Sequence, residues 1–534
     1  MPMRPILACC ALALMTGAAE AEFTLHVLHT NDLHSRIEAV NRFDSTCSAE
    51  EATKNECFGG VARLAAKVAQ MRADLAGAGQ NVLLLDAGDQ FQGSLMYTTY
   101  KGAAEAEFME RIGYDAMALG NHEFDDGPDG LAEFLGKVTF PVISGNLDLS
   151  RSNVLQGKVK NHVVLEVGGR KIGIVSVLAT DTVETSSPGP QVIFQNEIDS
   201  LRADVAALEA EGVSHIIALN HVGYLKDQEI AAAVPGLDAV VGGHSHTYLS
   251  ATDPDRTGAY PTWVSAPDGS LVPVVQAYAY SKYLGHVVLT FDDAGALKHA
   301  GGNTILLDAS VTPDAAIAAR VAELAAPLEE VRARVIGQTA AAIDGSREAC
   351  RARECAMGNL IADAMLDRVR AQGVTIAIQN GGGVRASIDA GPVTMGEVLT
   401  VLPFQNTLAT FQATGADLAA ALENGVSQIE EGAGRFPQVA GMTFAVDPAA
   451  PAGARISDVR VAGATGFTPI DPATLYGVVT NNYVRGGGDG YRMFAANAVD
   501  AYDFGPDLAD VLAEYLAATG PYQPALDGRI TIAE

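Results

Sequence analysis

Residues 239–246 read Ala239-Val240-Val241-Gly242-Gly243-His244-Ser245-His246, a short apolar run followed at once by two glycines and two spaced histidines. The same order, an apolar run and then acidic, amide or imidazole side chains, occurs at four earlier places. They are Asp32-Leu33-His34, Asp86-Ala87-Gly88-Asp89, Gly120-Asn121-His122-Glu123-Phe124-Asp125 and Asn220-His221. The apolar runs predict strands, and ligands of open α/β sheets bind beyond the carboxyl ends of strands. We therefore expect these five loops to converge at one edge of a single sheet.

Length and charge limit the class of protein. The chain has 534 residues, too many for one hydrophobic core, which predicts at least two large domains. Its formal net charge is -29, from 35 basic and 64 acidic residues. This balance repels polyanions, so we expect no nucleic acid polymer as a partner. An anionic substrate would need local basic groups.

The N-terminus has the pattern of an export signal: a basic start, an apolar segment at 6–15 and the small-residue site Ala19-Glu20-Ala21. We expect residues 1–21 to be a signal peptide and the mature protein to be periplasmic or secreted. A buried N-terminal helix is the alternative. No other apolar stretch reaches the roughly 20 residues that span a bilayer, so we expect no stable membrane insertion.

Four cysteines of the expected mature chain fall into two local pairs. Disulfides Cys47–Cys57 and Cys350–Cys355 are the simplest prediction for an oxidising compartment. A structural zinc held by four thiolates is the alternative. The wide separation of the pairs and the lack of C-x-x-C spacing disfavour it.

Strand and helix candidates alternate up to about residue 310, which predicts a layered α/β domain with a parallel or mixed sheet. Strands are expected at 23–29, 82–85, 116–119, 142–144, 172–177, 215–219, 239–241, 274–277 and 286–291, and helices at 60–75 and 197–211. A polar and Ala-rich helix from Thr312 to about residue 335 predicts a connector to a second α/β region. The expected division is therefore 1–21, 22–311, 312–335 and 336–534.

Seven side chains in the five loops have the chemistry of metal ligands: Asp32, His34, Asp89, Asn121, His221, His244 and His246. Carboxylate, imidazole and amide oxygen suit divalent ions such as zinc or manganese. A site for two ions that share one carboxylate needs about this many protein groups if water fills the other positions. Singly, each residue could be a cap, a turn residue or a structural histidine. Their shared position after strands favours a metal site.

Longer stretches resemble known families. NDLH at 31–34, GDQFQG at 88–93, GNHEFDDG at 120–127, NH at 220–221 and GGHSH at 242–246 resemble the calcineurin-like metallophosphoesterase signature. With CRARECAMGN at 350–359, NGGGVR at 380–385, VLPFQN at 401–406 and NNYVRGGGDGY at 481–491, the chain resembles the secreted 5'-nucleotidase and UDP-sugar hydrolase family. The resemblance implies a metallophosphoesterase domain (a β-sandwich flanked by helices), a linker helix and a C-terminal α/β substrate-binding domain.

The same resemblance assigns roles to residues of the first domain. Asp32, His34, Asp89 and His246 would hold one metal ion, and Asp89, Asn121, His221 and His244 the other. The ions, zinc or else manganese or cobalt, would activate a water for in-line attack on phosphorus. His122 would stabilise transition-state charge, with Asp125 orienting its imidazole. His246 is a departure, because the best-known relatives carry an amide residue there.

Substrate contacts are assigned to the second domain. Arg351, Asn380 and Arg385 match the positions that hold the phosphate or nearby oxygens. Phe404 and Tyr483 match two aromatic residues that sandwich a nucleobase, although Tyr483 replaces a more usual phenylalanine. Asp489 would accept hydrogen bonds from ribose hydroxyls.

Together with the export signal, the resemblance implies an exported metal-dependent 5'-nucleotidase that releases phosphate from nucleoside 5'-monophosphates, with UDP-sugars and other nucleotides as further substrates. One alternative is a 2',3'-cyclic nucleotide 2'-phosphodiesterase with 3'-nucleotidase activity. Others are a nicotinamide dinucleotide pyrophosphatase and a non-catalytic nucleotide-binding protein. The expected partners are nucleotide substrates, and the sequence sets no oligomeric state.

Overall fold

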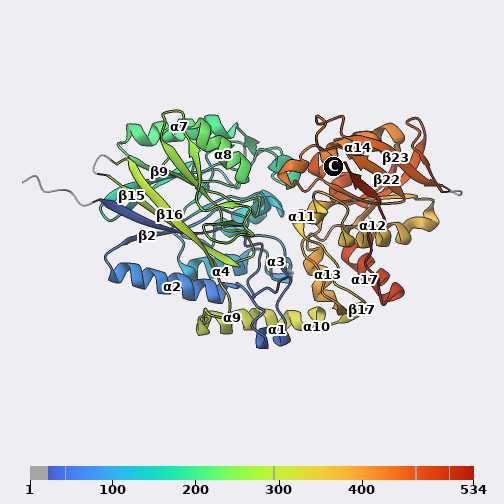
Figure 1. The fold of residues 1–534 in the computed structure, drawn as a ribbon, viewed down its shortest axis with the longest axis horizontal. Helices are drawn as coiled ribbons and strands as arrows, with labels where there is room; N and C mark the ends of the chain where they lie inside the picture. The colour runs from blue at the N-terminus through green and yellow to red at the C-terminus, as the bar shows by residue number, and fades with distance from the viewer. Residues whose placement is uncertain (1–21, 43, 293–294, 464–465, 504, 534) are drawn as a thin grey trace, which may run out of the picture.

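A computed structural model describes residues 22–533 except 43, 293–294, 464–465 and 504, so the expected signal peptide lies outside the described residues. The chain forms two α/β lobes side by side, with the N-terminal half in blue to green and the C-terminal part in orange to red (Figure 1). The predicted two-domain α/β class is confirmed.

The first domain contains two six-stranded sheets, with the orders β16-β15-β1-β2-β3-β4 and β13-β14-β10-β9-β7-β6. Their central strands pair in parallel, β1 with β2 and β9 with β10. The strands of the first sheet are β1 (Phe23–Thr30), β2 (Asn81–Asp86), β3 (Ala116–Ala118), β4 (Val142–Ile143), β15 (Tyr283–Phe291) and β16 (Leu297–Leu306). Those of the second are β6 (His162–Val167), β7 (Arg170–Val175), β9 (His215–Leu219), β10 (Ala239–Val241), β13 (Thr262–Ser265) and β14 (Leu271–Val275).

Helices cover the outer face of each sheet. Between the sheets, Leu25 and Val27 of β1 belong to one buried cluster with Ile174 and Ile217 of the second sheet. Figure 1 shows α7 and α8 above the sheets and α2 below them. The main helices of this domain are α2 (Val61–Gly77), α3 (Leu95–Tyr100), α4 (Ala103–Ile112), α5 (Gly127–Leu135), α7 (Glu197–Ala210) and α8 (Tyr224–Ala233). The expected β-sandwich flanked by helices is confirmed.

One expectation about the sheet is wrong. The loops after β1, β2 and β3 leave the first sheet, whereas the loops after β9 and β10 leave the second. The central strands β3, β9 and β10 are buried along their whole length and read as continuous apolar runs in either sheet. Local sequence therefore could not separate two stacked sheets from one wide sheet.

The connector is two helices instead of one. α9 (Ala315–Ala325) and α10 (Glu329–Arg332) are separated by the 3-10 turn η2 (Ala326–Leu328). This turn contains Pro327, which has no N–H to donate and disrupts a continuous α-helix. Arg332 pairs with Glu38 of the first domain at 2.7 Å, so the end of the connector is tied to the sandwich.

The second domain is built on a five-stranded sheet of order β21-β18-β25-β20-β26. Helices α12 and α17 pack with one buried cluster and α14 and α16 with the other. A four-stranded sheet of order β24-β23-β22-β27 and the pair β17-β19 complete it. The strands are β17 (Val335–Thr339), β18 (Ile376–Asn380), β19 (Gly391–Thr394), β20 (Leu408–Thr414), β21 (Pro437–Ala440), β22 (Met442–Val446), β23 (Ile456–Gly463), β24 (Gly466–Pro469), β25 (Leu475–Asn481), β26 (Val499–Tyr502) and β27 (Ile530–Ile532). The helices are α11 (Arg347–Cys350), α12 (Ala356–Val369), α13 (Met395–Val401), α14 (Gly415–Val426), α15 (Asn482–Arg485), α16 (Arg492–Asn497) and α17 (Leu508–Thr519).

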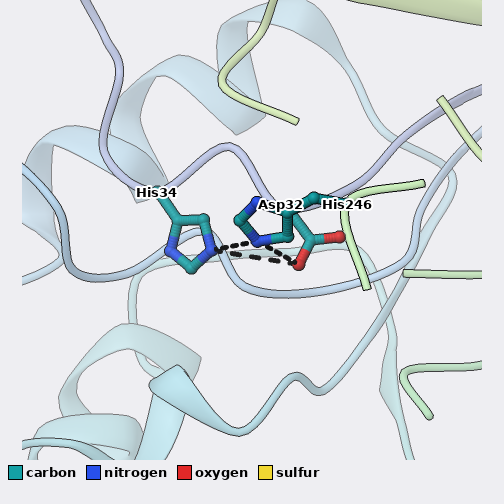
Figure 2. Close-up of side chains that lie close together, drawn as sticks. All are labelled: Asp32, His34 and His246. Carbon is teal, nitrogen blue, oxygen red and sulfur yellow. Dashed lines mark hydrogen bonds and ion pairs between the residues drawn. The ribbon is translucent and has the colours of Figure 1, made fainter. Parts of the chain in front are cut away.

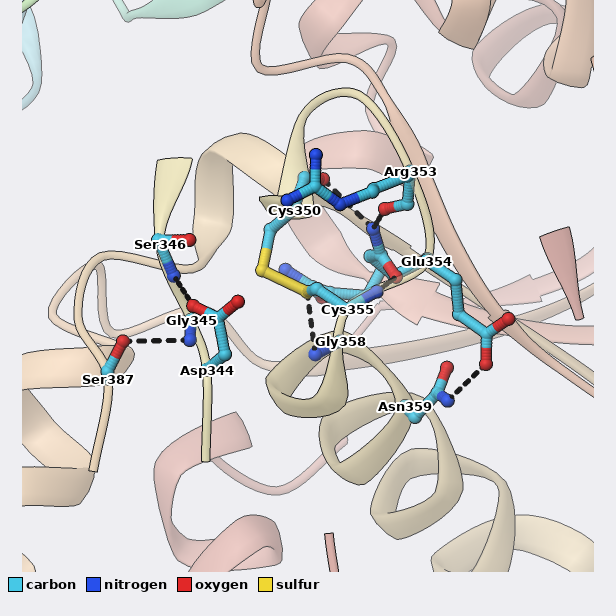
Figure 3. Close-up of a disulfide and its surroundings, with 12 residues drawn as sticks. Asp344, Gly345, Ser346, Cys350, Arg353, Glu354, Cys355, Gly358, Asn359 and Ser387 are labelled. Atoms are coloured by element: carbon cyan, nitrogen blue, oxygen red, sulfur yellow. Dashed lines mark hydrogen bonds between the residues drawn. A yellow bond between two sulfur atoms is a disulfide. The ribbon is translucent and has the colours of Figure 1, made fainter. Parts of the chain in front are cut away.

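Both predicted disulfides are present, Cys47–Cys57 and Cys350–Cys355. The second joins the end of α11 to the start of α12, where Cys355 Sγ accepts a hydrogen bond from the Gly358 N–H at 3.2 Å (Figure 3). Since each sulfur is bonded to its local partner, the four-thiolate zinc site is excluded.

Candidate active site

The five predicted loops meet at one end of the sandwich. Five of their seven candidate ligands have a left-handed backbone, with φ between 50° and 72°: Asp32, His34, Asp89, His244 and His246. This conformation is unfavourable for residues other than glycine and concentrates at functional sites, where the surrounding structure holds it in place. The strained backbone therefore marks these loops as a candidate site.

A first cluster joins Asp32, His34 and His246 (Figure 2). Nε2 of His34 lies 3.0 Å from Nε2 of His246, which in turn lies 3.2 Å from Oδ1 of Asp32. His34 Nδ1 lies 3.2 Å from the Phe91 carbonyl oxygen, to which it can donate. That contact leaves Nε2 as the ring atom that faces the cluster.

A second cluster joins Asp89, His221 and His244. Asp89 Oδ2 lies 3.1 Å from His221 Nε2, and His221 Nδ1 lies 2.6 Å from the Ala87 carbonyl oxygen. Asn121 belongs to the same group, because its Oδ1 lies 2.8 Å from His244 Nδ1. Asp89 Oδ2 is also 3.7 Å from His34 Nε2, so this carboxylate lies between the two clusters.

Burial sets the charge state of most of these imidazoles. It lowers the pKa values of His34, His244 and His246 well below the usual range, which favours the neutral form that binds metals. Burial also disfavours the His221 cation, but the Asp89 carboxylate outweighs it and raises the pKa of His221 to about 10. A proton and a metal ion would therefore compete for His221. Two carboxylates, one amide oxygen and four imidazoles fit the donor preferences of two divalent cations.

His122 stands beside both clusters in the 3-10 turn η1 (His122–Phe124). Its Nδ1 lies 2.6 Å from Asp125 Oδ2. Burial by itself lowers the pKa of His122, but the charges of Asp125 and Asp89 raise it above the usual value. The pair therefore favours an imidazolium cation at the edge of the clusters.

Glu123 has a structural role that the sequence did not reveal. Its carboxylate accepts hydrogen bonds from the backbone N–H groups of Asp89, Gln90, Phe91 and Gly120, at 2.7 to 3.2 Å. These bonds tie the loop after β2 to the loop after β3. The only signal in the sequence was an acid in the middle of the Asn121-to-Asp125 motif that had no assigned role.

A cavity of about 1010 Å³ lies between the two domains. From the first domain it is lined by His34, Asp89, Asn121, His122, His244 and His246, among others. All six predicted substrate contacts of the second domain also line it: Arg351, Asn380, Arg385, Phe404, Tyr483 and Asp489. Five of the seven predicted metal residues thus line one space with all six predicted substrate residues. Asp32 and His221 contact His246 and Asp89 without lining the cavity.

Two of the second-domain residues reach the first domain. Arg385 Nη2 lies 2.9 Å from His34 Nε2, and its guanidinium lies over the Phe404 ring at 5.6 Å. The Phe404 ring stacks on His122 with centroids 5.7 Å apart. One small anion at this point would contact groups of both domains.

Asn380 and Tyr483 form a hydrogen-bonded group around Asp489, whereas Arg351 Nη1 donates to the Gly432 carbonyl oxygen at 3.5 Å. Asn380 Nδ2 donates to Asp489 Oδ2 at 2.7 Å, and the Tyr483 hydroxyl donates to Asp489 Oδ1 at 3.1 Å. A phenylalanine in place of Tyr483 would lack the second of these bonds. The tyrosine therefore adds a fixed partner for Asp489.

Arg347 is a cavity residue that the sequence analysis missed. It lies on α11 one helical turn before Arg351, and its Nη2 donates to the His244 carbonyl oxygen at 3.4 Å. Residues four apart share a helix face. The four-residue spacing of Arg347 and Arg351 was the available signal, but the stretch that resembles the family begins at Cys350.

The β-sandwich, its paired clusters of metal-type donors and the arginine-lined second domain define a two-domain metallophosphoesterase, a hydrolase of phosphoric esters. Residues 25–248 match the family model for calcineurin-like phosphoesterases, and residues 335–496 match that for the 5'-nucleotidase C-terminal domain. The chain is 40% identical to a 5'-nucleotidase of Diplobatis ommata, over 98% of this chain and 92% of that protein. It is 38% identical to the human 5'-nucleotidase, over 97% and 93% of the two chains.

A solved structure agrees with these matches. The 5'-nucleotidase precursor of Thermus thermophilus superposes with a TM-score of 0.90 at 41% identity, covering 96% of this chain and 99% of that one. This chain belongs to the 5'-nucleotidase family.

Proposed function

We propose that this chain is an exported, metal-dependent 5'-nucleotidase that hydrolyses nucleoside 5'-monophosphates to nucleoside and phosphate. The proposal is supported above all by one cavity that has metal-type donors on one side and Arg351, Arg385, Phe404 and Tyr483 on the other. A nucleotide has the matching chemistry, since its phosphate suits cations and its base suits aromatic rings.

Seven residues would hold two divalent ions. Asp32, His34, Asp89 and His246 would bind one ion, and Asp89, Asn121, His221 and His244 the other, with zinc favoured by the four imidazoles and manganese or cobalt as alternatives. When bound, such ions polarise phosphoryl oxygens and lower the pKa of a water that attacks phosphorus in line. The inward ring nitrogens and the intermediate place of Asp89 support this assignment.

Other side chains would bind and orient the substrate. His122 offers a cationic N–H to a phosphoryl oxygen, and Asp125 keeps the proton on that ring. Arg351 and Arg385 balance the phosphate charge, with Asn380 beside them. Phe404 and Tyr483 stack on the base, and Asp489 accepts hydrogen bonds from the ribose. These roles agree with the positions of the residues around the cavity.

The proposed domain extents are 22–311 for catalysis, 312–335 for the connector and 336–534 for nucleotide binding. The cavity volume of about 1010 Å³ is at the upper end for ligand pockets, which favours additional larger substrates such as UDP-sugars.

Export to a periplasmic or extracellular location is supported by the two disulfides, which persist in oxidising compartments. Within the described part of the chain, no helix has both the length and the apolar character needed to cross a bilayer. Cell fractionation and N-terminal sequencing of the mature protein test this location. A mature chain that begins at Glu22 supports export, and an intact Met1 in the cytoplasm contradicts it.

Phosphate release tests the activity. Purified protein is assayed with AMP, UMP, UDP-glucose, ATP and 2',3'-cyclic AMP, with and without a chelator. We expect rapid, chelator-sensitive hydrolysis of AMP and UMP. Turnover of the cyclic nucleotide without AMP hydrolysis would instead identify a cyclic phosphodiesterase, and a metal-replete protein that hydrolyses no nucleotide would identify a binding protein.

A further inference from the structure

The carboxylate of Asp125 is held on both of its oxygens. Oδ2 lies 2.6 Å from His122 Nδ1 and accepts a weaker hydrogen bond from Gln92 at 3.3 Å. Oδ1 accepts a hydrogen bond from the Ser186 hydroxyl at 2.6 Å. Because a carboxylate is planar, a partner on each oxygen fixes its rotation. Ser186 therefore helps to set the direction in which Asp125 meets the imidazole.

Ser186 ends a short segment, residues 179–186, whose first residue is hydrogen-bonded to the His221 loop. The Ala179 N–H donates to the His221 carbonyl oxygen at 3.0 Å, and Thr182 Oγ1 donates back to the Ala179 carbonyl oxygen at 2.7 Å. The segment then forms α6 (Thr182–Thr185), and the Ser186 N–H closes it by donating to the Thr182 carbonyl oxygen at 3.0 Å. The segment thus runs from a candidate metal loop to Asp125.

α6 also contacts the second domain. α6 packs against the 3-10 turn η6 (Gly488–Gly490), which carries Asp489. Burial and the charges of Asp489 and Asp125 together raise the pKa of the Tyr483 phenol, so Tyr483 also lies within electrostatic range of Asp125. A single helical turn is unstable by itself and needs tertiary contacts. η6 supplies such a contact.

We propose that Ser186 is a positioning residue that transmits the docking of the Gly488–Gly490 turn through α6 and Asp125 to the orientation of His122. The inference rests on the proposed function, because it requires His122 to act on the phosphoryl group. The contact with η6 holds α6 in place, and the Ser186 hydroxyl keeps Asp125 aligned with His122.

The test compares Ser186→Ala, Ser186→Thr and the control Ser187→Ala. Threonine keeps the hydroxyl, whereas Ser187 is exposed and makes no hydrogen bond to Asp125 among the described residues. Steady-state kcat and KM are measured with AMP and with 4-nitrophenyl phosphate, which has no nucleoside. Circular dichroism and thermal unfolding verify that the variants are folded.

For Ser186→Ala we expect kcat with AMP to fall about 10-fold and KM to change less than about twofold, as for partners that orient catalytic groups. Ser186→Thr should restore most of kcat and Ser187→Ala should match the wild type. With 4-nitrophenyl phosphate, kcat of Ser186→Ala should fall by a similar factor, because His122 acts on the phosphoryl group of either substrate. An unchanged kcat with AMP, a loss confined to one of the two substrates or an effect on KM alone would overturn the inference. If the wild-type protein itself fails to hydrolyse AMP, the proposed function and this inference both fall.

Discussion

The contact between Asp125 and His122 allows the proposed charge stabilisation to be tested with a nearly isosteric change, Asp125→Asn. Asp125 Oδ2 lies 2.6 Å from His122 Nδ1, and both side chains are largely buried. The asparagine oxygen can still accept the ring N–H but carries no negative charge. Since burial lowers the pKa of His122 and the acidic neighbours raise it, removal of the Asp125 charge should lower that pKa.

The expected size of the effect follows from the charged hydrogen bond. Such a bond contributes about 1.5–3 kcal/mol, and about 1.4 kcal/mol corresponds to a tenfold change in rate. We therefore expect Asp125→Asn to lower kcat with AMP about 10- to 150-fold. His122→Gln removes the imidazole and should lower kcat about 100- to 1000-fold. The double variant should resemble His122→Gln alone, because Asp125 acts through His122.

The assay is phosphate release from AMP as a function of pH. A raised pKa keeps His122 protonated to higher pH, so wild-type activity is lost as pH rises through that value. In Asp125→Asn the loss should begin at a lower pH. An unchanged alkaline limb, together with multiplicative losses in the double variant, would refute the role given to this pair.

Three further predictions concern the metal ligands, a buried acid and a disulfide. Because relatives carry an amide at the position of His246, His246→Asn should retain at least about 10-fold more kcat than His244→Asn; equal severe losses would count against the division between two ions. Burial raises the pKa of Asp227 to about 8, so the protonated side chain adds to the free energy of unfolding at low pH. This contribution to the free energy of unfolding is lost as pH rises from about 4 to 8. Urea denaturation should therefore show a flatter pH dependence for Asp227→Asn over that window, and parallel curves would disprove it. Joint replacement of Cys47 and Cys57 by alanine should lower the free energy of unfolding by about 2–4 kcal/mol in urea melts, and no change would contradict a stabilising cross-link.

Local sequence patterns predicted strands well where strands are short, apolar and bounded by polar loops. The strand at 215–219 was expected with its observed bounds, and each candidate ligand follows a strand as predicted. β6 and β16 were not expected from the sequence. β16 contains Lys298, Gly301 and Gly302, and its strand structure is stabilised by its pairing with β15. Pro327 divides the connector into two helices, although the residues around it favour a helix.

The residues of the candidate site were predicted where residue type and a local motif identify them. Glu123, Ser186 and Arg347 acquire their roles only through contacts with segments distant in the sequence, such as the Asp89 loop and Asp125. No local periodicity encodes such contacts. The pairing of loops from two different sheets was missed for the same reason.

We propose that residues of the five loops hold two divalent ions that the reaction requires. Metal content by plasma mass spectrometry, measured together with AMP hydrolysis before and after chelation, tests it most directly. We expect two divalent ions per chain, loss of activity on chelation and recovery when zinc, manganese or cobalt is returned. Full activity in a protein stripped of metal would contradict it.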